Sequence, residues 1–189
     1  MAASVPDSST LLYVLIVACE VAFWLVLLLA LATRYLLRRE RLSRLLIWSL
    51  PAIDVLLLAF TAMDLRSGAP PTFAHGLAAA YVGFTVAFGS LAIRWADRHF
   101  AHRFAGGPAP PGSPASRWLA VRFELGLWLR SIVAWFITLA LLGVLIEFLD
   151  NELVTQTLGR WDRIAFVSVV LWFVFGPVWS LLFFRREGR

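Results

Sequence analysis

The sequence has no lysine, a single cysteine and only 15% charged residues. With Cys19 alone, an intramolecular disulfide and a thiolate metal cage are both excluded. The chain also lacks the His-Glu-x-x-His metal motif, a glycine-rich phosphate loop and the Gly-x-Ser-x-Gly elbow of serine hydrolases. We therefore expect no enzymatic activity, no cofactor and no metal site.

Apolar residues dominate instead: 60% of the chain is hydrophobic and the mean hydropathy is +0.79. Five apolar stretches each approach the roughly 20 residues that a helix needs to cross a bilayer. They cover residues 11–32, 45–63, 73–93, 132–149 and 164–184. The sequence thus predicts an all-α membrane protein, a bundle of five transmembrane helices that forms a single integral membrane domain over residues 1–189.

Arginine supplies all seventeen basic side chains, and only Arg66, Arg160 and Arg163 fall in the second and fourth connections. Because basic residues are retained on the cytoplasmic side, this asymmetry predicts a plasma-membrane protein with its N-terminus outside and its C-terminus in the cytoplasm. Clustering at span ends favours contact with anionic inner-leaflet lipids and not with nucleic acid. The other fourteen are Arg34, Arg38, Arg39, Arg41, Arg44, Arg94, Arg98, Arg103, Arg117, Arg122, Arg130, Arg185, Arg186 and Arg189.

Small residues recur every three or four positions in the third apolar stretch. This spacing lets helix backbones approach closely in a membrane, so we expect the helix at residues 73–93 to be the packing centre of the bundle. The residues concerned are Gly76, Ala79, Ala80, Gly83 and Ala87.

Glycine and proline mark the breaks along the chain. Residues 105–116 are too rich in both to hold a helix, which predicts a cytoplasmic linker between the third and fourth spans. Residues 117–130 mix apolar side chains with scattered charges, and we expect them to form an interfacial segment leading into the fourth span. Pro51 and the pair Gly176-Pro177 predict helix kinks.

Two carboxylates, Glu20 and Asp54, fall well inside predicted spans. An ionisable group there costs at least about 2.5 kcal/mol and persists with a partner or a purpose. Their predicted depths differ by only about 6 Å, so they would repel if both were charged, and one is expected to carry a proton. This candidate intramembrane site either holds a proton or cation, or joins neighbouring helices through hydroxyl groups such as those of Thr61, Thr85 or Thr138.

Two histidine patterns complete the inventory of candidate sites. The short turn before His75 is expected to bring it near Asp64, as an exterior polar pair that either passes protons or simply forms a hydrogen bond. Residues 97–102 read Asp-x-His-x-x-His, and this places two imidazoles on one helical face. A third ligand is missing and arginines flank the motif, so we do not expect a metal there.

The arrangement of Cys-Glu-Val-Ala-Phe-Trp at 19–24, Asp54, the Asp64 turn, His75-Gly76 and Tyr81-Val-Gly83 resembles small uncharacterised multi-span proteins of bacterial plasma membranes. The resemblance implies a membrane fold and assigns no residue a role. The composition and the motifs favour an interaction or accessory role in the membrane, with a membrane-protein partner or a second copy. The alternative is a small proton- or cation-coupled transporter that uses Glu20 and Asp54.

Overall fold

The computed structural model describes residues 8–35, 37, 39–111 and 116–183, without the side chains of residues 8–13, 16, 20, 104 and 105. Every secondary-structure element in this part of the chain is a helix. The first four are α1 (Ser8–Tyr35), α2 (Glu40–Arg66), α3 (Phe73–Ala105) and α4 (Arg117–Leu149). They are followed by α5 (Glu152–Leu158), α6 (Trp161–Phe173), the π-helical turn η1 (Val174–Val178) and α7 (Trp179–Phe183).

Five helical segments are long and apolar enough to cross a membrane, as the hydropathy pattern predicts. The fifth is composite, because α5, α6, η1 and α7 follow one another between Glu152 and Phe183. The chain is therefore an all-helical protein with five candidate membrane spans.

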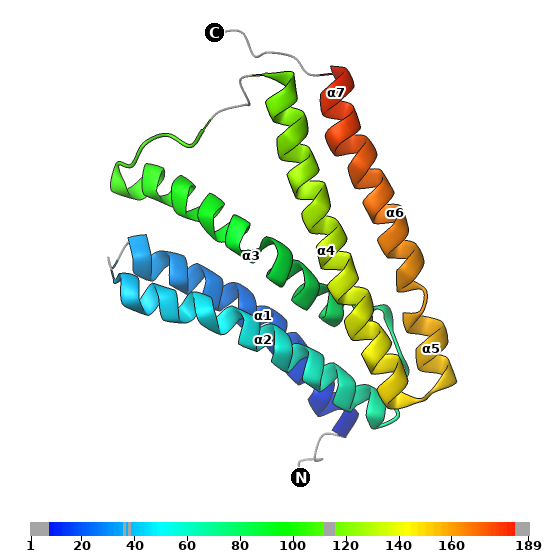
Figure 1. Ribbon diagram of the computed structural model, residues 1–189. Coiled ribbons are helices and arrows are strands. Elements are labelled where there is room, and N and C mark those ends of the chain that lie inside the picture. The colour runs from blue at the N-terminus through cyan, green and yellow to red at the C-terminus, as the bar shows by residue number, and fades with distance from the viewer. Residues whose placement is uncertain (1–7, 36, 38, 112–115, 184–189) are drawn as a thin grey trace.

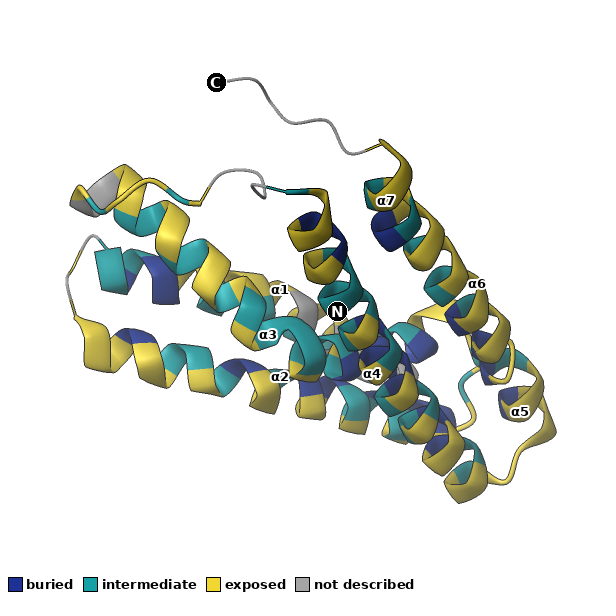
Figure 2. Cartoon of the chain, turned by 45° about the horizontal axis from the view of Figure 1, so that its top comes forward, coloured by how far each residue is buried: buried dark blue, intermediate teal, exposed yellow. Residues whose placement is uncertain are grey.

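The helices form two arms (Figure 1). One arm consists of α1, α2 and α3, and the other pairs α4 with the segment from α5 to α7. The arms meet near the α2–α3 turn and the α4–α5 turn, and they separate towards the opposite end (Figure 1). Figure 2 shows buried residues where the helices face one another and exposed residues along their outward sides.

The fourth helix corrects one expectation. Residues 117–130 belong to the continuous helix α4 and do not form a separate interfacial segment. The Ser116 hydroxyl caps the start of α4 by accepting a hydrogen bond from the Leu119 N–H at 3.3 Å. Asp150, with φ of 44°, adopts the left-handed conformation that ends the helix. Since no proline lies between these two residues, the helix propagates through the arginines at its start.

The two proline sites behave differently. Pro51 lies inside α2, which continues to Arg66 without interruption. Gly176 and Pro177 lie in η1, where the helix widens to a π turn. Proline cannot donate the usual hydrogen bond, and a wider turn is one way in which a helix accommodates it.

The stripe of small residues in α3 forms the contact between the two arms. Ala79 is fully buried and Ala80 is nearly so. A methyl group at Gly83 would overlap Thr138 and the Ala134 carbonyl of α4, and one at Gly76 would overlap the indole of Trp161. Gly83 therefore lets α3 approach α4 closely, and Gly76 leaves room for the Trp161 indole at the start of α6.

Replacing Gly83 with leucine should lower the thermal unfolding temperature in detergent, since overpacking a close contact costs at least about 1–3 kcal/mol. Gly143→Leu is the matched control, because nothing lies within 4 Å of a side chain started there. Circular dichroism of the two variants tests this, and an equal loss of stability in both would contradict the close-approach argument.

Candidate functional site

Asp54 is a buried acid at the middle of α2, about 21 Å along the helix from Glu40. Only 3% of the residue is exposed. The Thr85 hydroxyl of α3 lies next to its carboxyl group, and Oδ2 is buried without a partner among the described residues. A cavity of about 20 Å³, enough for one water, adjoins it. The other lining residues are Cys19, Phe23, Trp24, Leu57 and Tyr81.

The partnership of Asp54 with Glu20 stays a prediction, because the Glu20 side chain lies outside the described part of the structure. Of the three threonines that the sequence offered as partners for the carboxylates, one lies next to Asp54. Thr85 lies next to the Asp54 carboxyl group, whereas the Thr138 hydroxyl donates to the Ala134 carbonyl of its own helix at 2.9 Å. Thr61 is buried, and its hydroxyl has no partner among the described residues.

The structure brings Asp64 and His75 together across the α2–α3 turn. His75 Nε2 lies 3.1 Å from Asp64 Oδ2, and the Thr72 backbone N–H donates to His75 Nδ1 at 2.9 Å. Because a backbone amide can only donate, Nδ1 is the accepting nitrogen and Nε2 carries the hydrogen that is donated to Asp64. His75 therefore fixes the start of α3 and partners a buried acid at the same time.

This pair is a buried feature of the bundle. Asp64 is 5% and His75 6% exposed, and the ring of Trp161 packs over the neighbouring Gly76. Phe73 stacks on the same indole with ring centroids 4.7 Å apart. Aromatic side chains thus cover the first turn of α3, and Asp64 Oδ1 has no partner in the described part of the chain.

The buried polar groups of α2 share one face of the helix. Their spacing of three, seven and eleven residues returns to nearly the same side of an α-helix. Each has a buried oxygen without a partner among the described residues, and a buried polar atom of this kind is unusual in a folded protein. The four residues are Ser43, Asp54, Thr61 and Asp64.

Sequence reasoning missed Glu124 of α4, which borders an open hollow of about 370 Å³ beside the π turn. A methyl group at Gly176 would stand only 2.9 Å from Glu124 Oε2, so glycine makes room for this carboxylate. The Gly176-Pro177 pair was the available signal, but only the folded chain shows that α4 places an acid opposite it. The other lining residues are Ser168, Leu171, Trp172 and Phe175.

The Asp-x-His-x-x-His motif is engaged in structural contacts. Asp97 pairs with Arg34 at 3.1 Å and accepts the Tyr35 hydroxyl at 2.9 Å, which joins α1 to α3. His99 and His102 contact the backbone carbonyls of Trp95 and Gly107. Among the described residues, no group of three or more His, Cys, Asp or Glu side chains is placed to hold a metal ion.

His75→Ala should destabilise the protein by about 3 kcal/mol, because it leaves both the Thr72 N–H and the Asp64 carboxyl without their partner. Thermal unfolding in detergent measures the effect, with His99→Ala at an exposed position as the control. His75→Gln should recover part of the loss, since a glutamine at this position can accept from the N-cap backbone. Equal stability of the two alanine variants would show that the pair is energetically unimportant.

Comparison with known proteins identifies the family of this chain. No family model and no solved structure matches it. The chain is 39% identical over 145 residues to YmcC of Bacillus subtilis (strain 168), which is described as an uncharacterized membrane protein. The aligned part covers 77% of this chain and 78% of YmcC. Together with the five apolar helices, this similarity shows that the chain belongs to the bacterial multi-span membrane protein family of YmcC.

Proposed function

We propose that this protein has an interaction or accessory role within the plasma membrane and is not an enzyme. The separation of its two arms carries this proposal (Figure 1). No more than 28% of the apolar stretch of any of the five spans is buried inside the described chain. Much of the helix surface is therefore available to lipid or to another membrane protein.

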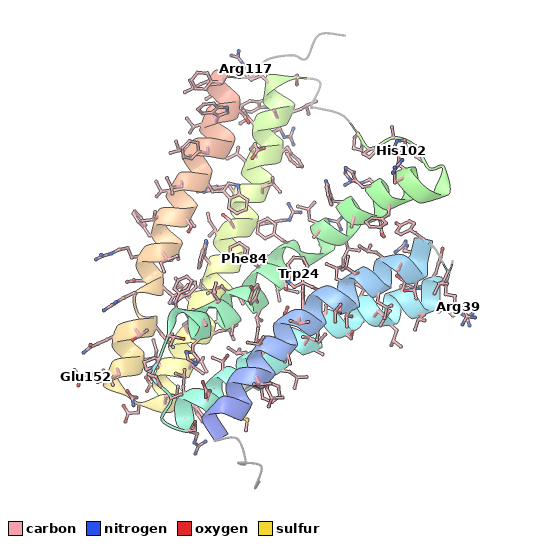
Figure 3. All side chains as sticks on the ribbon, turned by 180° about the vertical axis from the view of Figure 1, so that it is seen from behind. Trp24, Arg39, Phe84, His102, Arg117 and Glu152 are labelled. Atoms are coloured by element: carbon pink, nitrogen blue, oxygen red, sulfur yellow. The ribbon has the colours of Figure 1, made fainter. Side chains whose placement is uncertain are left out.

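The contact between the arms ends well before α3 does. Phe84 packs edge-on against Trp135 of α4, and Phe88 stacks on Trp172 of α6 with centroids 5.5 Å apart. Figure 3 shows Phe84 beside α4. Beyond Phe88, α3 continues for about 25 Å to Ala105 while it diverges from α4 (Figure 1). A transmembrane helix of a partner, or of a second copy, would gain packing against exposed side chains of both arms, such as Val86 of α3 and Phe123 of α4.

The arginine distribution supports an outside N-terminus and a cytoplasmic C-terminus. The start of α2 and the end of α3 lie at the same end of their arm, as the labels on Arg39 and His102 show (Figure 3). Six exposed arginines gather there, and each can add about 1 kcal/mol of attraction to anionic inner-leaflet lipids. They are Arg39, Arg41, Arg44, Arg94, Arg98 and Arg103.

Single cysteines in a Cys19→Ser background test the orientation. Ser67→Cys and Gln156→Cys occupy exposed positions that should react with an impermeant thiol reagent added to intact cells, whereas the exposed Ala109→Cys should react only after the membrane is opened. Labelling of Ala109→Cys in sealed cells would reverse the proposed orientation.

Proton- or cation-coupled transport is the second candidate, and Asp54 is the observation that favours it. Its Oδ2 has no partner among the described residues and it lies beside a cavity of water size at the middle of a span. A carboxyl group in such surroundings can take up and release a proton or a small cation.

One pair of measurements separates the two candidates. For the accessory role, photo-crosslinkers placed at Val86 and Phe123, which are exposed on α3 and α4, should capture a membrane protein or a second copy in native membranes. The matched position Phe166, exposed on α6, serves as the control. For transport, wild-type protein in liposomes should move protons or cations and Asp54→Asn should not. Flux that Asp54→Asn abolishes, without specific crosslinks, would replace the accessory role with transport.

A further inference from the structure

The hollow beside η1 differs from the Asp54 cavity in size and access. At about 370 Å³ it can hold a group much larger than a water molecule, and it is open at the protein surface. It lies between α4 and the last span, where the helix widens into a π turn. Such turns occur frequently at functional sites.

Three features of the hollow point to a positively charged ligand. Glu124 is a partly buried acid with neither an ion pair nor a hydrogen bond to any described residue. Trp172 and Phe175 supply aromatic surface, and rings attract cations through their negative faces. Phe88 is the ring that stacks on one side of Trp172, and it holds the indole in place.

The geometry points to a binding site for an organic ammonium group at Glu124. The carboxylate of Glu124 would face the charged nitrogen, Trp172 and Phe175 would cover its carbon substituents, and the Ser168 hydroxyl would accept an N–H where the group has one. Nothing in this assignment depends on the accessory role, so the site goes beyond the proposed function.

An inorganic cation fits this hollow poorly. Calcium takes six to eight oxygen ligands and magnesium requires six in an octahedron. The side chains that line the hollow supply oxygens only from Glu124 and Ser168, and the other four residues are apolar, aromatic or glycine. Carboxylate with aromatic surface is instead the combination that recognises substituted ammonium ions.

The ammonium group has two natural sources. Gly176 lies about 22 Å along the last span from Trp161. Arg185 and Arg186 follow it by only nine and ten positions in the sequence, and arginines mark the end of a span, so the hollow is near one membrane surface. An amine-bearing phospholipid head group can reach this depth from the bilayer, and a small free amine can reach it from water. Both present the same chemistry to Glu124.

Binding to the full-length protein in detergent tests the site, with tetramethylammonium chloride as the probe and sodium chloride at equal ionic strength as the blank. Calorimetry should show saturable binding of tetramethylammonium and not of sodium. Glu124→Gln should weaken it by about tenfold or more, and Trp172→Leu by a smaller factor. Glu147→Gln, at an exposed position on the same helix, should bind like wild type.

Gly176→Ala gives a second test that keeps both ligating side chains. The added methyl group would crowd the Glu124 carboxylate, so binding should weaken although the charge is unchanged. Each variant is first checked for a wild-type helical spectrum, and if Glu124→Gln does not fold, Gly176→Ala and Trp172→Leu decide. Undiminished binding in the folded variants, or equal binding of sodium, would overturn the assignment.

Nanodiscs distinguish the two sources. If the natural ligand is a lipid head group, discs that contain phosphatidylethanolamine should reduce tetramethylammonium binding relative to discs of phosphatidylglycerol, and Glu124→Gln should remove that difference. If the ligand is a free amine, ethylammonium should compete equally in both kinds of disc. If neither phosphatidylethanolamine nor ethylammonium competes with tetramethylammonium, the site accepts only quaternary ammonium groups, and both natural sources are overturned.

Discussion

The close crossing of α3 and α4 at Gly83 is the contact on which the arrangement of this protein depends. In a bilayer no hydrophobic force drives apolar helices together, because lipid tails are as apolar as leucine. Association therefore rests on close packing, and Gly83 permits it by leaving room for Thr138 and the Ala134 carbonyl. The aromatic contacts of Phe84 and Phe88 extend the same junction between the arms. Without this junction, the three helices α1, α2 and α3 would be separate in the membrane from the pair formed by α4 and the last span.

Hydropathy predicted the five spans because a chain in hydrocarbon must satisfy its own backbone hydrogen bonds and therefore forms a helix. The length and the apolar content of a segment then nearly determine whether it spans the membrane. The turn length likewise anticipated the meeting of Asp64 and His75, since six residues from Ser67 to Thr72 leave little freedom. The divergence of the arms has no comparable signal, because crossing angles arise from the packing of side chains across two helices. Glu124 was missed for the same reason: its neighbour Gly176 is distant in sequence, and no local spacing connects them.

The acids of this protein are placed in contrasting ways. Asp64 is paired with a histidine, Asp97 with an arginine and a tyrosine, and both acids join neighbouring elements. Asp54 instead lies next to the Thr85 hydroxyl and a space of water size, and Glu124 lies beside a much larger open hollow. The buried Oδ2 of Asp54 has no partner among the described residues, which costs roughly 1–3 kcal/mol, and Glu124 is a half-buried acid without an ion pair there. Both acids adjoin a space that a ligand can enter, so these two positions are where we look for function.

The π turn has a geometric effect on everything that follows it. One additional residue in a helical turn rotates the remaining side chains by about 100° relative to an uninterrupted α-helix. The exposed rings of Trp179 and Phe183 in α7 are therefore oriented by Gly176 and Pro177 as much as by their own positions. If this turn had α-helical geometry, the end of the last span would be rotated about the helix axis and would present a different face to the lipid. The widened turn thus determines which face the end of this transmembrane helix presents.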